Sequence, residues 1–154
     1  MSGIEARLAE RGITLAVPRP PAANYLPVRR SGRILYVSGQ ISADSTGVIA
    51  GQLGRTMDLD AGRQAARAAA IALLAHIRHS AEVPLEEIAA ILRLLVLVNA
   101  APTFVGPHLV ANGASDLLVE ILGDAGRHAR SAIGVASLPL GAAVEIEAVV
   151  ELKA

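Results

Sequence analysis

An almost unbroken apolar run near the middle of the chain limits most strongly how this sequence can fold. Residues 91–98 read Ile-Leu-Arg-Leu-Leu-Val-Leu-Val, which is the length of a strand and too short for a membrane span. Apolar runs of this kind are typical of central strands that are buried on both faces. We therefore expect a layered domain that is built around a β-sheet.

Two amphipathic segments flank this run and predict two helices. Between Asp60 and His79, apolar residues recur three or four positions apart, and Arg63, Arg67 and Arg78 lie off that stripe. Asp58 or Asp60 is placed to cap this helix. Residues 109–122 repeat the pattern, and Gly123 is expected to end the second helix.

The remaining segments predict short elements at both ends of the chain. These are a helix at 2–11 capped by Ser2, strands at 25–28, 34–40, 131–137 and 143–152, a turn at Ser31–Gly32, a loop at 44–53 and a helical turn at 85–88. Because residues 17–22 are rich in proline, we expect an N-terminal helix and arm at 1–21 and one domain at 22–154. The order predicts an α+β fold, in which a mixed sheet with a hairpin at each end carries two helices on one face.

The composition narrows the choice of partners. Apolar residues make up 53% of the chain and aromatic residues only 2%, so the uncovered sheet face is apolar and is expected to be buried in a homotrimer with clefts between its subunits. The 14 basic and 14 acidic residues balance, which argues against nucleic acid as a main partner. We expect no membrane span. The absence of cysteine and of a signal-peptide pattern predicts a cytoplasmic location.

Arg130 and Glu145 are the strongest candidates for a functional site. They flank two strand-like runs joined by Pro-Leu-Gly, so we expect both charges at a sheet surface, facing one small ligand. A guanidinium binds a carboxylate through two parallel hydrogen bonds, and a nearby carboxylate can orient a water molecule and accept its proton. The alternative is an ordinary surface ion pair.

The histidines offer a competing chemistry. His76 and His79 lie one helical turn apart, but no nearby cysteine or acidic residue completes a recognisable zinc site, so no metal is expected. No nucleotide-binding fingerprint is present, and no cofactor is expected. His108 and His128 are the two histidines that are placed to line a cleft with Arg130.

Several motifs in the right order resemble one family. Ala129-Arg-Ser, followed by Pro139 and then Val144-Glu-Ile-Glu-Ala, is similar to the C-terminal signature of the reactive-intermediate deaminases, also called the RidA or YjgF family. Tyr36-Val-Ser-Gly-Gln is similar to its Ser-Gly-Gln strand end, and the positions of Tyr25 and Asn112 also match. The resemblance covers residues 22–151.

This resemblance implies a chorismate-mutase-like fold that assembles as a trimer and binds small carboxylates in clefts between subunits. Arg130 would clamp the carboxylate of the substrate, and Glu145 would position a water molecule. The family's other pocket positions correspond to Tyr25, Ser38, Gly39, Asn112 and the backbone near Ala132.

The implied reaction is hydrolysis of 2-iminoacids, or their enamine tautomers, to 2-oxoacids and ammonia, without a metal or cofactor. A non-catalytic trimer that senses a small carboxylate is the alternative, and the charge balance argues against ribonuclease activity. The chain departs from the family in three ways. His128 stands where a proline is common, the stretch from Asn112 to Arg130 is one residue longer, and the N-terminal arm is added.

Overall fold

The computed structural model describes residues 3–154. The elements in chain order are α1 (Ile4–Glu10), β1 (Val28–Ser31), β2 (Ile34–Ile41), β3 (Ala43–Asp44), β4 (Gly47–Val48), α2 (Leu59–His79), η1 (Leu85–Glu87), β5 (Ile88–Asn99), α3 (Pro107–Leu122), η2 (Gly123–Gly126), β6 (Ala129–Val135), η3 (Pro139–Gly141) and β7 (Val144–Leu152). Both long helices that the apolar periodicity predicted are confirmed, each within two residues of its expected start.

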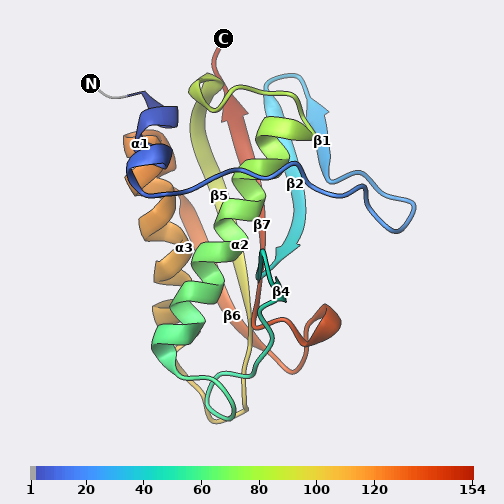
Figure 1. Cartoon of the computed structure of the whole chain (residues 1–154), viewed down its shortest axis with the longest axis vertical. Coiled ribbons are helices and arrows are strands. Elements are labelled where there is room, and N and C mark those ends of the chain that lie inside the picture. The colour runs from blue at the N-terminus through green and yellow to red at the C-terminus, as the bar shows by residue number, and fades with distance from the viewer. Residues whose placement is uncertain (1–2) are drawn as a thin grey trace.

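One mixed sheet forms the body of the molecule. Its strand order is β1-β2-β7-β5-β6, and every neighbouring pair is antiparallel except β5 and β6, which are parallel. Helices α2 and α3 lie side by side on the same face of this sheet (Figure 1). The predicted arrangement of a mixed sheet with two helices on one face is therefore confirmed.

The core lies between the two helices and this face of the sheet. Small side chains such as Ala66 and Ala69 face inward from α2, and Leu94, Val96 and Ile146 meet them from β5 and β7, all fully buried. Small residues on α2 let the helix approach the sheet closely, which is how a core with few aromatic residues reaches native density.

The structure shows which of the two candidate aspartates, Asp58 or Asp60, caps α2. Asp58 precedes the first helical residue in an extended conformation, and its Oδ1 accepts a hydrogen bond of 2.8 Å from the backbone N–H of Ala61. This bond satisfies one of the N–H groups that the first helical turn leaves without a partner. Asp58 is thus the cap, and Asp60 lies in the first turn.

Two predictions about the sheet are wrong. Strand β5 is not buried on both faces, because helices cover only one face of the sheet, and Arg93 on its other face is exposed. The last two strands do not form a hairpin. Instead β7 pairs with β2 and β5, while the crossover through α3 brings β6 back parallel to β5.

The first strand and one loop also differ from expectation. Tyr25 precedes β1 rather than belonging to it, and the expected loop at 44–53 contains the small β3–β4 hairpin. The turn at Ser31–Gly32 is confirmed, because Gly32 adopts a left-handed φ of 59° that a side chain would disfavour.

The N-terminal segment rests on the helical layer. Gly3 is the N-terminal cap of α1, and the predicted cap, Ser2, lies outside the described residues. Ile4 and Leu8 are buried against the core, and Arg7 Nε donates a hydrogen bond of 2.6 Å to the carbonyl of Ile121 in α3. The arm then crosses α2 on its way to β1 (Figure 1).

Candidate functional site

Arg130 extends from β6 toward α3 and is held there by three hydrogen bonds. Its Nη1 donates to Asn112 Oδ1 and to Ser115 Oγ, each at 3.0 Å, and its Nη2 donates to the carbonyl of His108 at 3.3 Å. Because residues at these spacings share one face of a helix, a single stripe of α3 supplies all three acceptors. The guanidinium is therefore fixed against the outer side of α3.

The free edge of this guanidinium can bind an anion. An arginine has five N–H donors, and the three bonds occupy both N–H groups of Nη1 and one of Nη2. Nε–H and the second N–H of Nη2 have no acceptor among residues 3–154. Two N–H groups on adjacent nitrogens are what a carboxylate needs for a bidentate contact. Arg130 is also exposed, so a ligand can reach it.

His128 lies behind Arg130 and contacts the same serine. Its Nδ1 is 2.6 Å from the carbonyl oxygen of Gly126, and its Nε2 is 2.9 Å from Ser115 Oγ. Burial lowers the pKa of His128 below its ordinary value, the bond to Gly126 opposes this, and the charge of Arg130 lowers the pKa further. On balance the surroundings favour the neutral form of the imidazole.

Glu145 lies on the sheet face that no helix covers. The side chains before and after it, Val144 and Ile146, are fully buried under the helices, and alternation along β7 turns Glu145 to the opposite face. Burial raises the pKa of Glu145 above its ordinary value, and the negative charge of Glu147 on the same face raises it further. A carboxylate with a raised pKa is a better proton acceptor than an ordinary one.

Gly39 and Ser38 form an irregular point of β2 beside Glu145. The register between β2 and β7 shifts between Val37 and Gln40, so these two residues interrupt the ladder. A Cβ atom at position 39 would collide with the carboxylate of Glu145, so glycine lets that flexible side chain keep the position it has here. The proximity of Gly39 to Glu145 is therefore a property of the fold.

Ser38 ties the segment that carries Tyr25 to the sheet. Its hydroxyl donates a bond of 2.8 Å to the carbonyl of Leu26, and its backbone N–H donates to the carbonyl of Pro27 at 2.9 Å. Tyr25 directly precedes these two anchored residues, and its side chain is 53% exposed. An exposed tyrosine beside an anchored backbone is available to a ligand or a partner.

The predicted site residues fall into two groups in one chain. The first, which we call the arginine group, is Arg130, Asn112 and Ala132 on β6 and α3. The second, which we call the glutamate group, is Glu145, Gly39, Ser38 and Tyr25 on β7, β2 and the segment before β1. Strand β5 separates β6 from β7, and the two groups belong to opposite faces of the sheet. One chain therefore does not bring Arg130 and Glu145 to the same ligand.

Position 132 belongs to an edge strand. Ala132 packs against the core from the same face as Arg130, and β6 stands at the end of the strand order. One side of the β6 backbone thus has no strand partner among the described residues, so its N–H and C=O groups can pair with a ligand or another chain.

Sequence reasoning missed Ser115. The signal was present, since Ser115 follows Asn112 by three residues and shares its helix face, but a serine within a helix usually satisfies itself locally. His108 contributes its backbone carbonyl, which a side-chain motif does not encode.

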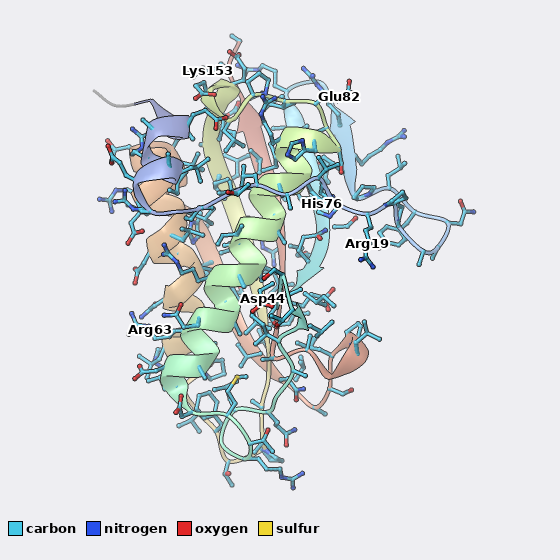
Figure 2. The ribbon with its side chains drawn as sticks, viewed as in Figure 1. Arg19, Asp44, Arg63, His76, Glu82 and Lys153 are labelled. Atoms are coloured by element: carbon cyan, nitrogen blue, oxygen red, sulfur yellow. The ribbon has the colours of Figure 1, made fainter. Side chains whose placement is uncertain are left out.

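A separate cavity of about 560 Å³ lies between the arm and α2. Its lining is mostly alanine and other apolar residues, with Asp44 and His76 among the polar ones; Figure 2 shows both near the side of α2 that the arm crosses. None of the predicted site residues lines this cavity, so it is not the site defined by Arg130. Among residues 3–154, no three His, Asp or Glu side chains gather to hold a metal ion.

Comparison with known proteins identifies the family. Residues 5–152 match the family model described as "YjgF/chorismate_mutase-like, putative endoribonuclease". The chain belongs to the YjgF family, also called RidA. Its α+β fold is the chorismate-mutase-like fold of that family.

Individual relatives agree over nearly the whole chain. Protein TCP17 of Trypanosoma cruzi is 43% identical over 151 residues, which is 97% of this chain and 94% of that protein. The crystal structure of Atu1372 from Agrobacterium tumefaciens, a protein described as of unknown function, is 44% identical, with a TM-score of 0.90 over 97% of this chain and 92% of that one. An endoribonuclease-like protein from Shewanella oneidensis is 31% identical, with a TM-score of 0.92 over 98% of this chain and all of that one.

No helix among residues 3–154 combines the length and the apolar character that crossing a bilayer requires.

Proposed function

We propose that this YjgF-family protein is an enamine/imine deaminase, which hydrolyses 2-iminoacids to 2-oxoacids and ammonia in a cleft between two subunits of a trimer. The observation that carries the proposal is Arg130, whose guanidinium is fixed by α3 with two N–H groups left for a carboxylate. Family membership supports the same substrate class.

The separation of the two residue groups supports a site made by two copies. Arg130 stands at the β6 edge of the sheet, and Glu145 lies on the uncovered face toward β2. A neighbouring copy that packs on this uncovered face would bring its glutamate group to the arginine group of the first. Three copies arranged in this way would close a ring with three equivalent clefts.

The reaction needs few groups. The carbon of a C=N bond is already electrophilic, so Arg130 binds the carboxylate and orients that carbon, and Glu145 holds a water molecule and accepts its proton. The water oxygen bonds to the imine carbon, and its proton passes from Glu145 to the nitrogen, which gives a carbinolamine. Glu145 then takes the proton of the new hydroxyl group and returns it to the amino nitrogen, and the C–N bond breaks. Ammonia leaves, and the carbon becomes the carbonyl of a 2-oxoacid. Each iminoacid consumes one water, and no electron transfer is required.

The second candidate function is a trimer that binds a small carboxylate without catalysis. The same Arg130 contacts support it, because they supply binding and not chemistry. The raised pKa of Glu145 favours the enzyme, since a sensor has no use for a proton acceptor on this face. Ribonuclease action is the weakest candidate, because 14 basic residues are balanced by 14 acidic ones.

Substitution of Arg130 tests the clamp. Arg130→Ala should abolish both 2-oxoacid binding and imine hydrolysis, because the ligand carboxylate loses its counter-ion. Arg130→Lys should restore little, since an ammonium cannot form the bidentate contact. Calorimetry with pyruvate and an assay in which an amino-acid oxidase generates the imine provide the two measurements.

Arg127→Ala is the matched control, because Arg127 is exposed and pairs only with nearby Asp124 among the described residues. Undiminished turnover in Arg130→Ala would place the clamp elsewhere.

Substitution of Glu145 separates the enzyme from the sensor. Glu145→Gln keeps the size of the side chain and removes the proton acceptor, so turnover should fall at least a hundredfold while pyruvate affinity stays within roughly twofold. If the wild-type protein binds pyruvate but removes the imine no faster than buffer does, the deaminase proposal fails and the sensor remains.

A further inference from the structure

A chain of hydrogen bonds runs behind Arg130, on the side away from its free edge. It begins at the carbonyl of Gly126, passes through His128 and Ser115, and ends at Arg130 Nη1, with contacts of 2.6, 2.9 and 3.0 Å. His128 stands at a position where the YjgF resemblance predicts proline. This series of hydrogen bonds is therefore a feature of this sequence that the family pattern does not supply.

The direction of each hydrogen bond follows from its partners. A carbonyl oxygen only accepts, so His128 Nδ1 must carry the proton in the bond to Gly126. In a neutral imidazole the other nitrogen then accepts, so the hydroxyl of Ser115 donates to Nε2. This leaves the lone pairs of Ser115 Oγ for the N–H of Arg130. Of the two neutral tautomers, only the one protonated at Nδ1 satisfies all three bonds.

His128 therefore sets the direction in which the hydroxyl of Ser115 points. A serine inside a helix commonly turns its hydroxyl back to the carbonyl of the preceding turn, and its lone pairs then face elsewhere. Donation to His128 holds the hydroxyl in the orientation that accepts from Arg130. The half-buried imidazole lies between η2 and α3 and is itself fixed by Gly126, so it has little freedom to turn away.

We propose that His128 is a positioning residue for carboxylate binding, which acts through Ser115 to hold the Arg130 guanidinium with its Nε and Nη2 edge toward the ligand. This proposal rests on the proposed function only in taking Arg130 as the carboxylate clamp. Asn112 and the carbonyl of His108 also hold the guanidinium from the same helix. Loss of the hydrogen bonds through His128 and Ser115 therefore loosens the guanidinium and does not release it.

A double-mutant cycle tests the connection. His128→Ala and Ser115→Ala should each weaken pyruvate binding roughly tenfold, and should raise KM with little change in kcat, because a loose guanidinium binds ground state and transition state equally poorly. If the two residues act in series, the double variant should bind pyruvate as tightly as the single variant that has lost more affinity. Losses that add in the double variant would overturn the proposal.

A conservative substitution distinguishes the role of His128 Nε2 as a hydrogen-bond acceptor from the packing of its ring. His128→Gln can place an amide oxygen near the position of Nε2, where it accepts from Ser115, so we expect it to keep most of the pyruvate affinity that His128→Ala loses. A glutamine variant as weak as the alanine variant, with both folded by thermal melting, would contradict the assigned role of the acceptor.

A readout without any ligand keeps this inference apart from the proposed function. In a 15N-arginine spectrum, with the Arg130 signal assigned by its loss in Arg130→Lys, rotation of the guanidinium should be slow in the wild type and faster in Ser115→Ala and His128→Ala. An unchanged Arg130 signal in both variants would overturn the positioning role. If instead the signal responds as expected but the wild type binds no pyruvate, the proposed function fails and the role of His128 in ordering Arg130 stands.

Discussion

At the scale of single residues, the fold prepares Glu145 and Arg130 in different ways. Arg130 is held by hydrogen bonds that it donates to α3, whereas the carboxylate of Glu145 occupies space that a Cβ atom at position 39 would fill. The raised pKa of Glu145 follows from its partial burial on the sheet and from the charge of Glu147. The two groups thus combine a permanent cation with a carboxylate that is ready to take up a proton.

The raised pKa of Glu145 predicts a pH-dependent cost to stability. Between the ordinary glutamate pKa, about 4.3, and the higher folded value, the folded chain binds more protons than the unfolded chain, so stability falls as pH rises through this window. Glu145→Gln removes this cost. The variant should melt at a higher temperature than the wild type at pH 7, and the difference should vanish at pH 3.5.

Thermal melting at the two pH values provides the measurement. Glu86→Gln, at an exposed glutamate of η1, is the control and should show no such crossover. An equal difference between Glu145→Gln and the wild type at both pH values would mean that ionisation of Glu145 is not the cause.

The sequence identified the candidate side chains better than it placed them. Arg130 and Glu145 were recognisable from their chemistry and motifs, and Gly39 from its position beside Ser38. Their distribution over two faces was not, because the face of each residue depends on which strands pair and in what register. Ser115 escaped notice because its partner His128 is distant along the chain and meets it only through the packing of α3.

At the scale of elements, α2 and α3 approach so closely that one helix contacts the backbone of the other. Gly113 of α3 faces Arg63 of α2, and a Cβ atom at position 113 would collide with the carbonyl oxygen of Arg63. Figure 2 shows Arg63 on α2 beside α3. Both helices were predictable from their periodicity, but this contact was not, since a glycine inside a helix carries no mark of what it faces.

Enlarging Gly113 should therefore separate the helices. Gly113→Ala is expected to lower the free energy of unfolding by about 1–3 kcal/mol despite the better helix propensity of alanine, because backbone atoms cannot move aside as side chains do. Urea denaturation followed by circular dichroism measures the loss. Gly134→Ala is the control, because its added Cβ would lie 3.6 Å from Ala100 and Pro107, an ordinary contact. A Gly113→Ala protein as stable as the wild type would contradict the close helix contact.

The pairing of the last strands shows where sequence reasoning stops. Strands β6 and β7 were correctly expected as separate extended segments, but neighbours in sequence were assumed to pair. Alternation along β7 fits a central position as well as a hairpin, since both bury one face. Only the competition among all strands for the same sheet decides between them.

At the scale of the whole molecule, the uncovered sheet face is apolar as well as charged. It carries Tyr36, Leu95, Leu97, Ile133 and Val149 together with Glu145 and Glu147. Ile133 is 48% exposed and Tyr36 is 53% exposed, although both belong to strands of the main sheet. An apolar surface of this kind is typical of an interface between subunits.

A charge on this face should prevent assembly. We expect the wild type to be a trimer by light scattering at micromolar concentration, and Ile133→Asp to be a monomer, because an aspartate would be buried without a partner. Val17→Asp, at a 77% exposed residue of the arm, should leave the trimer intact. The monomeric variant should also lose imine hydrolysis, since its arginine and glutamate groups no longer meet. A monomeric wild type would refute the trimer and the shared cleft together.

The central position of β7 has a consequence for how the protein is made. A ribosome synthesises β2 and β5 long before β7, the strand that lies between them. Until that strand has left the exit tunnel, the nascent chain has two sheet edges without their common neighbour and two helices without a complete surface to cover. Pairing so distant in sequence is slow, and unpaired edges with exposed apolar side chains favour aggregation. The half-made chain, more than the finished protein, is the form that a cell has to protect.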